Sequence, residues 1–182
     1  EKPIIVSNDQ MEDLAFLTNN KLKVFTGYNR PNAPFIKKLM LRIGIKYSIT
    51  FVVNGHFLPS DHWYRNNDQG TRVLGNLSHW LDLSYKLFSL TNEFKKIDIY
   101  LVKGYLDDIT VILKQVDQTI SIVFSANLEP LNGVEEFLYW NSNVSLGVID
   151  NFRQFDSVSW KKKESIRNLN KNVGHVETII SP

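Results

Sequence analysis

Apolar and polar positions alternate most regularly over residues 45–53, which predicts a β-strand with one buried face. The apolar positions of this segment are Ile45, Tyr47, Ile49, Phe51 and Val53. Three further apolar segments follow at 97–103, 109–116 and 119–125. Asp117 and Gln118 separate the last two and suit a two-residue hairpin turn, so the three segments are expected to form an antiparallel meander.

A helical pattern precedes the meander. Apolar side chains recur there at spacings of three and four residues, at Trp80, Leu83, Leu87, Leu90 and Phe94. So broad an apolar stripe needs a sheet to pack against. Two further helices are predicted nearer the N-terminus, one from Ser7 to about Asn19 and one that begins at Pro34 and ends before Gly44.

Together these patterns predict an α+β fold. A mostly antiparallel sheet, with strands near 45–53, 97–103, 109–116 and 119–125, is expected to pack against a long helix near 77–94, with one or two further N-terminal helices. Short strands are expected at 4–6 and 22–25. Beyond Pro130 the pattern is weaker: residues 134–140 suit one or two helical turns, and residues 144–149 suit a strand.

Length and composition favour one domain. A chain of 182 residues with 43% hydrophobic residues can bury a core that needs no covalent cross-links. We assign 1–156 to a single α+β domain and 157–182 to a polar, basic C-terminal segment that could end in an edge strand at 176–180. An edge strand can pair with a strand of another chain, so the chain could form a homo- or hetero-oligomer through such an edge.

The small excess of positive charge has little bearing on the folded body. The net charge is +2, and the C-terminal segment holds the excess, with Lys161, Lys162, Lys163, Arg167 and Lys171 against Glu164 and Glu177. A nucleic-acid-binding domain needs a basic face on its folded body, so no nucleic acid partner is expected there. The apolar runs are too short to span a bilayer, which takes about 20 residues.

The residue types and motifs that the sequence lacks limit the classes of site and reaction that the chain can support. The chain has no cysteine, which excludes disulfides, thiolate metal sites and a cysteine nucleophile, and slightly favours an oxidising compartment. No Gly-rich phosphate loop is present, so nucleotide chemistry is disfavoured and no cofactor is predicted. Because the chain begins at Glu1 rather than at a methionine, we expect a mature product or a part of a longer protein.

The long polar connection at 54–70 is the candidate binding region. It combines aromatic, charged and imidazole side chains, and we predict that ligand or partner contacts come from Phe57, Asp61, His62, Trp63, Tyr64 and Arg65. Trp, Tyr and Arg are enriched at binding hot spots because each offers a large contact area with a polar group. The alternative is that Trp63 and Tyr64 pack into the core.

A catalytic interpretation of the same connection is an open alternative. His56, Asp61 and His62 could ligate zinc, or could act as an acid and base in a small hydrolase. Their spacing matches no standard metal pattern, and no nucleophilic serine motif accompanies them. We therefore predict neither catalytic nor metal-binding residues in the chain.

Two asparagines lie in acceptor sequons for glycosylation, Asn76-Leu77-Ser78 and Asn143-Val144-Ser145. Asn76 also precedes the predicted long helix, and an asparagine at that place is a favourable helix cap. The cap needs only local geometry, so it is the preferred interpretation of Asn76.

These observations favour a non-catalytic domain that binds a protein or a small ligand. The preferred hypothesis is the extracytoplasmic, periplasmic part of a membrane-anchored sensor or envelope assembly protein, and not an enzyme. The alternatives are the small hydrolase or metal-dependent enzyme just described, and a cytosolic inhibitor or immunity-type binding protein.

Overall fold

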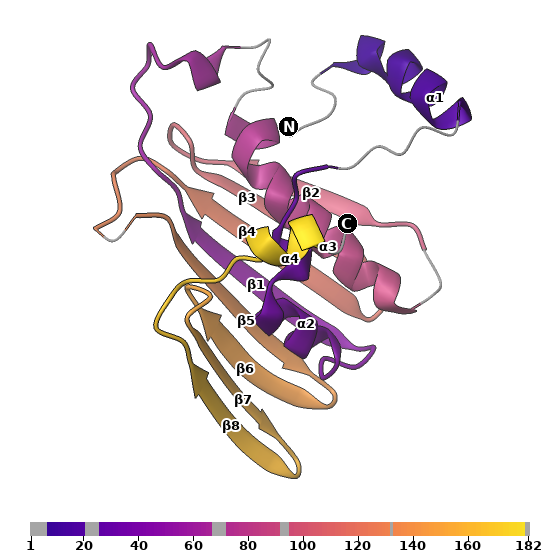
Figure 1. The fold of residues 1–182 in the computed structure, drawn as a ribbon, viewed down its shortest axis with the longest axis vertical. Helices are drawn as coiled ribbons and strands as arrows, with labels where there is room; N and C mark the ends of the chain where they lie inside the picture. Colours follow the sequence, from indigo (N-terminus) through magenta and orange to yellow (C-terminus); the bar gives the residue numbers. More distant parts are fainter. Residues whose placement is uncertain (1–6, 21–25, 67–71, 92–94, 132, 181–182) are drawn as a thin grey trace.

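The computed structural model describes residues 7–20, 26–66, 72–91, 95–131 and 133–180. Within these residues eight strands form one sheet, in the order β2-β3-β4-β1-β5-β6-β7-β8 (Figure 1). The strands are β1 (Tyr47–Asn54), β2 (Asp98–Lys103), β3 (Ile109–Gln115), β4 (Gln118–Ser125), β5 (Glu135–Ser142), β6 (Ser145–Asp150), β7 (Gln154–Ser159) and β8 (Lys162–Arg167).

Short helices connect and flank the strands. The α-helices are α1 (Met11–Asn19), α2 (Pro34–Met40), α3 (Ser78–Phe88) and α4 (His175–Ile180). Single turns of 3-10 helix are η1 (Asn8–Gln10), η2 (Arg30–Asn32), η3 (Trp63–Arg65) and η6 (Ser89–Thr91), and a π-helical turn, η5 (Val73–Leu77), leads into α3.

Strand β1 lies in the middle of the sheet although it is the first strand in the sequence. It pairs in parallel with β4 and antiparallel with β5, and the other strand pairs are antiparallel. Tyr47, Ile49, Phe51 and Val53 of β1 are all buried. Because β1 and β4 are parallel, the chain must return from the end of β1 to the other end of the sheet before β4 can pair with it. Helix α3, which lies between β1 and β2 in the sequence, makes part of this return.

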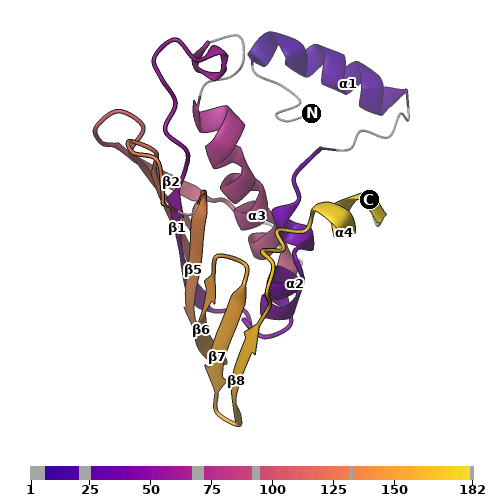
Figure 2. The same ribbon diagram turned by 60° about the vertical axis from the view of Figure 1, so that its left-hand side comes forward.

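The helices α2, α3 and α4 lie on one side of the sheet, which Figure 2 shows nearly edge-on. Trp80 of α3 packs on Phe51 of β1 and on Phe152, with ring centroids 5.1 and 6.4 Å apart. Phe35 of α2 packs on Phe155 of β7, at 5.7 Å. The core therefore lies between these helices and one face of the sheet.

The segment after β8 returns to the start of the helical layer. Asn29 donates from Nδ2 to the carbonyl of Val173, at 2.8 Å. Gly174 has φ +88°, and a Cβ atom at this position would lie 2.5 Å from the backbone nitrogen of Ala33. Because only glycine fits there, this close approach fixes residues 171–175 beside η2.

The predicted fold class is wrong. The sheet is mixed and has eight strands, and in the part of the chain that the structure describes no helix longer than the 11 residues of α3 packs on it. The helix expected over 77–94 ends at Phe88, where the Ser89 hydroxyl donates to the carbonyl of Tyr85 and a 3-10 turn follows. Most of the stability of a helix comes from the packing of its apolar face, and the packed part of this face ends here, because Leu87 and Phe88 are buried whereas Leu90 is 37% exposed.

Predictions for the C-terminal half also need correction. Residues 134–140, expected to be helical, form most of β5, in which Glu136, Leu138 and Trp140 are buried on one face. The domain boundary placed at 157 falls inside β7, and β8 continues the same sheet. The edge strand expected at 176–180 is part of helix α4. The strands expected at 4–6 and 22–25, and Phe94, lie outside the described residues.

Each of the described helices is too short or too polar to cross a bilayer.

We predict that Gly147→Ala destabilises the fold by about 1 to 3 kcal/mol, because the core has no room for an added methyl group. Gly147 lies on the buried face of β6, where a Cβ atom would come within 2.5 Å of the Trp140 ring and would also meet the carbonyl of Asp156. Urea unfolding would measure the loss. As a control, Gly27→Ala should change stability by less than about 0.5 kcal/mol, since nothing lies within 4 Å of its Cβ position; equal losses in both variants would contradict the packing argument.

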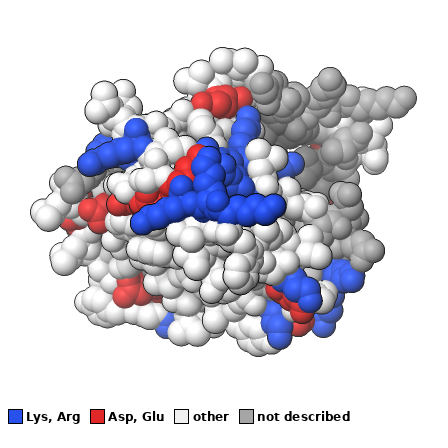
Figure 3. Space-filling view, turned by 90° about the horizontal axis from the view of Figure 1, so that it is seen from below, with Lys and Arg blue, Asp and Glu red and all other residues white. Residues whose placement is uncertain are grey.

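Acidic and basic side chains meet at the end of the molecule that carries the β7–β8 hairpin, seen from below in Figure 3. There Glu164 of β8 pairs with Lys38 of α2 at 2.8 Å and with Arg42 just beyond it. The hydrogen bonds from Lys38 and Arg42 lower the pKa of Glu164 to about 2. This cluster joins the last strand to the helical layer.

Stability should therefore fall as the pH is lowered from about 4.5 towards 2. The folded pKa of Glu164 lies below its unfolded value, so the unfolded chain binds more protons in this window and the stabilisation is lost as the pH falls. Melting temperatures of the wild type and of Glu164→Gln, measured across this range, would test the assignment. The variant should show a shallower pH dependence, and an unchanged dependence would show that Glu164 is not responsible.

Candidate functional site

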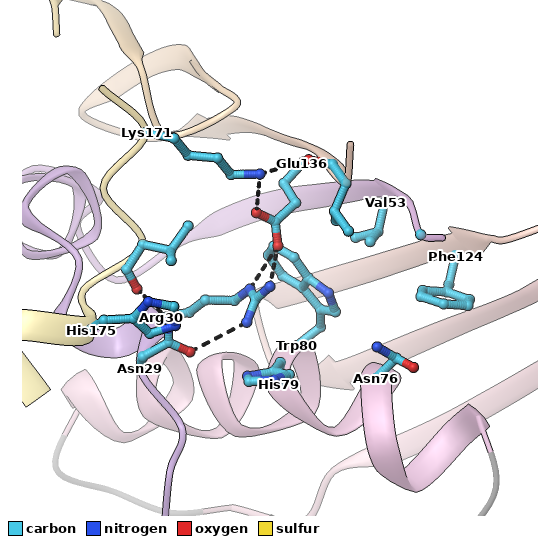
Figure 4. Close-up of a pocket in the computed structure, with 13 residues that line it drawn as sticks. Asn29, Arg30, Val53, Asn76, His79, Trp80, Phe124, Glu136, Lys171 and His175 are labelled. Carbon is cyan, nitrogen blue, oxygen red and sulfur yellow. Dashed lines mark hydrogen bonds and ion pairs between the residues drawn. The ribbon is translucent and has the colours of Figure 1, made fainter. Parts of the chain in front are cut away.

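The main candidate site is a cavity of about 270 Å³ at the carboxyl ends of β1 and β4 (Figure 4). Because these two strands are parallel, they end at the same edge of the sheet, where β5 also begins. The lining residues come from η2, the strand ends, the start of α3 and the segment after β8; they are Asn29, Arg30, Val53, Gly55, Asn76, His79, Trp80, Phe124, Val134, Glu136, Lys171, Val173 and His175.

A buried carboxylate organises the charges in this cavity. The Glu136 side chain is only 1% exposed. Arg30 Nε donates to its Oε1 atom at 2.9 Å, and a second guanidinium nitrogen, Nη2, donates to the same oxygen. Lys171 Nζ pairs with the other carboxylate oxygen at 2.7 Å and also donates to the carbonyl of Val134 at 2.7 Å.

This network holds three distant parts of the chain together. Arg30 belongs to η2, Glu136 to β5 and Lys171 to the segment after β8. A buried charge is tolerated only when opposite charges and hydrogen bonds compensate for lost hydration, and Glu136 has both. The guanidinium of Arg30 also lies over the Trp80 ring, 4.8 Å from its centroid. The network thus fixes one wall of the cavity against the helix.

Helix α3 supplies an imidazole to the cavity. His79 is 5% exposed and lies on the first turn of α3, next to Trp80, whose burial against Phe51 fixes this part of the helix. The Tyr28 and His79 rings form a T-shaped pair, with centroids 5.4 Å apart. Imidazole is the side chain that most often transfers protons in enzymes, so His79 is the candidate acid or base of the cavity.

The turn before α3 is anchored by a second buried cation. Arg72 donates from Nη1 to Asn76 Oδ1 at 3.0 Å and from Nη2 to the carbonyl of His56, and its guanidinium lies 5.7 Å from the Phe124 ring centroid. Asn76 itself lies inside the π-helical turn η5, and the residue at the N-cap position of α3 is Leu77. The prediction that Asn76 caps the helix is wrong.

The six residues predicted to bind a ligand or partner do not line this cavity. Phe57 and Trp63 are 44% and 59% exposed, Asp61 is exposed, and the His62 ring stacks on Trp63. Tyr64 lies in η3. Arg65 has a structural partner, since it donates to both carboxylate oxygens of Asp107, at 2.8 and 3.2 Å. A binding role for these residues stays a prediction.

The structure does not bring His56, Asp61 and His62 together as a catalytic or metal site. His56 instead pairs with Glu129, and this hydrogen bond is the main cause of the lowered pKa of the Glu129 carboxyl. Among the described residues, no group of three or more histidine and carboxylate side chains has the geometry to hold a metal ion.

Sequence reasoning missed the residues that do line the cavity. Arg30 lies in a segment for which no helix or strand was predicted, Glu136 in the expected helical turns at 134–140 and Lys171 in the polar C-terminal segment. Arg30 and Glu136 are 106 positions apart. The one local signal was His79, a histidine on the broad apolar stripe of a helix. A polar group at such a position has to find a partner or border a cavity.

The described residues do not form a dinucleotide cradle. Such a cradle places a glycine-rich turn directly between a parallel strand and the N-terminus of a helix. Strand β1 is followed by the long connection that begins at Gly55, and β4 is followed by a connection to β5. The cavity therefore lacks the usual arrangement for holding the pyrophosphate of a dinucleotide.

The fold is similar to that of solved oxidoreductases. The chain is similar to a dehydrogenase (MviM) from Clostridium difficile, with a TM-score of 0.71, 16% identity, and coverage of 97% of this chain and 58% of that one. It is also similar to a levoglucosan dehydrogenase in complex with NADH and levoglucosan, with a TM-score of 0.72, 12% identity, and coverage of 96% and 55%. A Gfo/Idh/MocA family oxidoreductase from Vibrio cholerae matches with a TM-score of 0.62, 18% identity, and coverage of 91% and 52%.

The likeness is confined to structure. No protein-family model matches the sequence, and no curated protein matches it. The chain spans just over half the length of the solved proteins named above.

These neighbours overturn the function inferred from the sequence. They are dehydrogenases and oxidoreductases, and none of them is a non-catalytic binding domain, a sensor, an inhibitor or a hydrolase. The extracytoplasmic location rested on the sensor hypothesis and loses its support with it. The physical reason for the error is that the cavity is built from residues far apart in the sequence, so no local motif revealed it.

We predict that Glu136→Gln destabilises the protein by about 3 to 5 kcal/mol, because the substitution leaves Arg30 and Lys171 without their counter-charge in a buried network. Chemical unfolding would measure the change. The control is Asp117→Asn, which breaks the ion pair between Asp117 and Lys46. Their side chains are 55% and 59% exposed, so the free energy of unfolding should fall by at most about 1 kcal/mol. Similar losses in both variants would contradict the organising role of Glu136.

Proposed function

We propose that this chain forms the substrate-binding part of a nicotinamide-dependent dehydrogenase that oxidises a hydroxyl group on a small polar molecule of the sugar or polyol class. The observation that carries the proposal is the position of His79, buried in the wall of a polar cavity, in a fold that solved dehydrogenases share. One of those structures is of a levoglucosan dehydrogenase in complex with NADH and levoglucosan, which supplies the substrate class.

The cavity suits a small hydroxylated molecule in size and polarity. Its volume of about 270 Å³ lies just below the usual range for the sites of drug-sized ligands, which is consistent with a smaller molecule. Asn76 and Asn29 offer amide groups, and Arg30 and Lys171 offer charged N–H donors held in place by Glu136. Fixed donors and acceptors of this kind orient hydroxyl groups without having to reorganise on binding.

His79 is the residue that would handle the proton. When an alcohol becomes a carbonyl, the carbon gives up a hydride and the oxygen gives up a proton. In our proposal the hydroxyl proton goes to a ring nitrogen of His79, and the reverse reaction returns it to the new alcohol. The packing of Trp80 on Phe51, and of the His79 ring against Tyr28, would hold the imidazole in place for this transfer.

The coenzyme would be held largely by other residues. The cavity lacks the usual arrangement for holding a pyrophosphate, and the chain corresponds to between 52% and 58% of the chains of the solved oxidoreductases named above. We therefore propose that residues outside the printed sequence bind the nicotinamide coenzyme, which accepts the hydride, and that this chain positions the substrate against it.

The test is a dehydrogenase assay of the full-length protein with a panel of sugars, sugar alcohols and cyclic polyols and with NAD⁺ or NADP⁺, followed by the absorbance of the reduced coenzyme. His79→Asn should lower kcat by about 10²- to 10⁴-fold, the usual contribution of an acid or base, with a much smaller change in KM. Circular dichroism would show that the variant is folded.

The matched control is Lys86→Gln, on the exposed side of the same helix, which should leave kcat unchanged. Activity of His79→Asn equal to the wild type would exclude His79 as the proton acceptor. No reduced coenzyme with any member of the panel would count against the proposed substrate class.

A further inference from the structure

The charges that line the candidate cavity do not cancel. Among the described residues that line it, Arg30 and Lys171 are cations and Glu136 is the one carboxylate. The two cations share this carboxylate, since Arg30 binds one of its oxygens and Lys171 binds the other. The histidines of the lining, His79 and His175, can be neutral or positively charged but not negative. The cavity wall therefore has an excess of one positive charge.

This excess charge has little contact with water. The side chains of Arg30 and Lys171 are only 13% and 24% exposed. The ring of Trp80 also covers one face of the Arg30 guanidinium, 4.8 Å from the ring centroid. A cation removed from water is stable only beside an anion that compensates for its lost hydration. The fold provides one carboxylate for two cations, so a second anion is expected to come from the ligand.

Arg30 and Lys171 also retain N–H groups that a ligand can accept. A guanidinium has five N–H donors and an ammonium has three. Arg30 donates from Nε and Nη2 to Glu136 and from Nη1 to Asn29 Oδ1, the last at 3.4 Å. Lys171 donates to Glu136 and to the carbonyl of Val134. Within the part of the chain that the structure describes, two N–H groups of Arg30 and one of Lys171 are left over.

The opposite wall carries the groups that would meet the rest of the ligand. Asn76 and His79 extend from the α3 side of the cavity, whereas Lys171 lies across it (Figure 4). Arg72 donates to Asn76 Oδ1 at 3.0 Å, and because arginine can only donate, this bond leaves the Asn76 Nδ2 group as a donor for the ligand. A molecule that spans the cavity would therefore place a hydroxyl group at His79 and an anionic group at the two cations.

A carboxylate matches the excess charge better than a phosphate does. It carries a single negative charge, and its two oxygens can accept hydrogen bonds from Arg30 and Lys171 together. A phosphate monoester carries about 1.5 to 2 negative charges at pH 7, which would leave uncompensated negative charge beside Glu136. Hydrogen bonds between two ions are about twice as strong as those between neutral groups, so a carboxylate also binds better here than a hydroxyl group.

We infer that the substrate is a sugar acid, whose carboxylate binds Arg30 and Lys171 while one of its hydroxyl groups reaches His79. This inference rests on the proposed function and names the substrate more narrowly. The carboxylate does not react: the carbon that carries the hydroxyl group gives a hydride to the coenzyme, and the hydroxyl proton goes to His79. Arg30 and Lys171 therefore determine specificity and are not catalytic residues.

The first test compares matched substrates in the dehydrogenase assay of the full-length protein. D-Glucuronate and D-glucose differ only in a carboxylate in place of a hydroxymethyl group, and D-galacturonate with D-galactose and D-mannuronate with D-mannose are further pairs. For at least one pair, kcat/KM of the acid should exceed that of the neutral sugar about tenfold or more, mainly through a lower KM. D-Glucose 6-phosphate should be a poorer substrate than the preferred acid.

The second test changes the excess charge. Lys171→Gln removes one cation and leaves Glu136 paired with Arg30, so it should lower the ratio of kcat/KM for acid over neutral sugar about tenfold. Lys171→Arg keeps the charge and should retain most of the ratio. The matched control is Lys161→Gln, which makes the same change of charge on an exposed side chain between β7 and β8, outside the cavity lining, and should leave the ratio unchanged.

A binding measurement gives a readout that does not require turnover. With the reduced coenzyme present, the preferred acid should raise the melting temperature of the wild type, and it should do so much less for Lys171→Gln. The neutral sugar at the same concentration should have the smaller effect on the wild type. This comparison within the wild type needs no variant, so it stays decisive if Lys171→Gln does not fold.

The outcomes separate this inference from the proposed function. Neutral sugars oxidised as well as the acids would overturn the inference and leave the dehydrogenase standing. So would a preference for the phosphate ester, or a ratio that Lys171→Gln does not lower. Stabilisation by an acid without reduction of the coenzyme would support the carboxylate site and count against the dehydrogenase. Neither turnover nor stabilisation with any of these probes would overturn both.

Discussion

The parallel pairing of β1 with β4 is the constraint on which the rest of the structure depends. Two neighbouring strands that run the same way end at the same edge of the sheet, so Gly55 and Phe124 meet there, and the chain must cross over to bring them together. Helix α3 lies on this crossing and begins near the same edge, which places His79 beside the strand ends. The cavity is thus a consequence of topology before it is a consequence of particular side chains.

The ion pairs of Glu136 with Arg30 and Lys171 are a second constraint on the structure. Glu136 enters at the start of β5, and its two cations arrive from a 3-10 turn near the beginning of the chain and from the segment that follows the last strand. Because the carboxylate is almost fully buried, it is stable there only with both partners present. The same network that stabilises the fold therefore also sets the positions of polar donors around the cavity, and stability and site geometry cannot be varied independently.

The sequence predicted local structure better than it predicted topology. The alternation at 45–53 gave a strand where β1 lies, and Pro34 gave the start of α2, because both signals depend only on neighbouring residues. The same alternation is compatible with any neighbouring strand, so the pairing of β1 with β4 and β5 was not predictable. The composition of the segment from Phe137 to Trp140 is compatible with a helix or a strand. Pairing with the neighbouring strands β1 and β6 makes it a strand. The cavity residues escaped prediction because each is ordinary in its own segment, and only the fold unites them.

The central position of β1 also constrains how the chain reaches its native state. The hydrogen-bonding partners of β1 are residues 118–125 and 135–142, so both of its edges stay unpaired until long stretches of later sequence have been made and ordered. Pairings so distant along the chain close large loops and fold slowly. During synthesis, an apolar strand with two open edges is a template for aggregation. Folding of this protein is therefore most vulnerable between the emergence of β1 from the ribosome and the docking of β4 and β5.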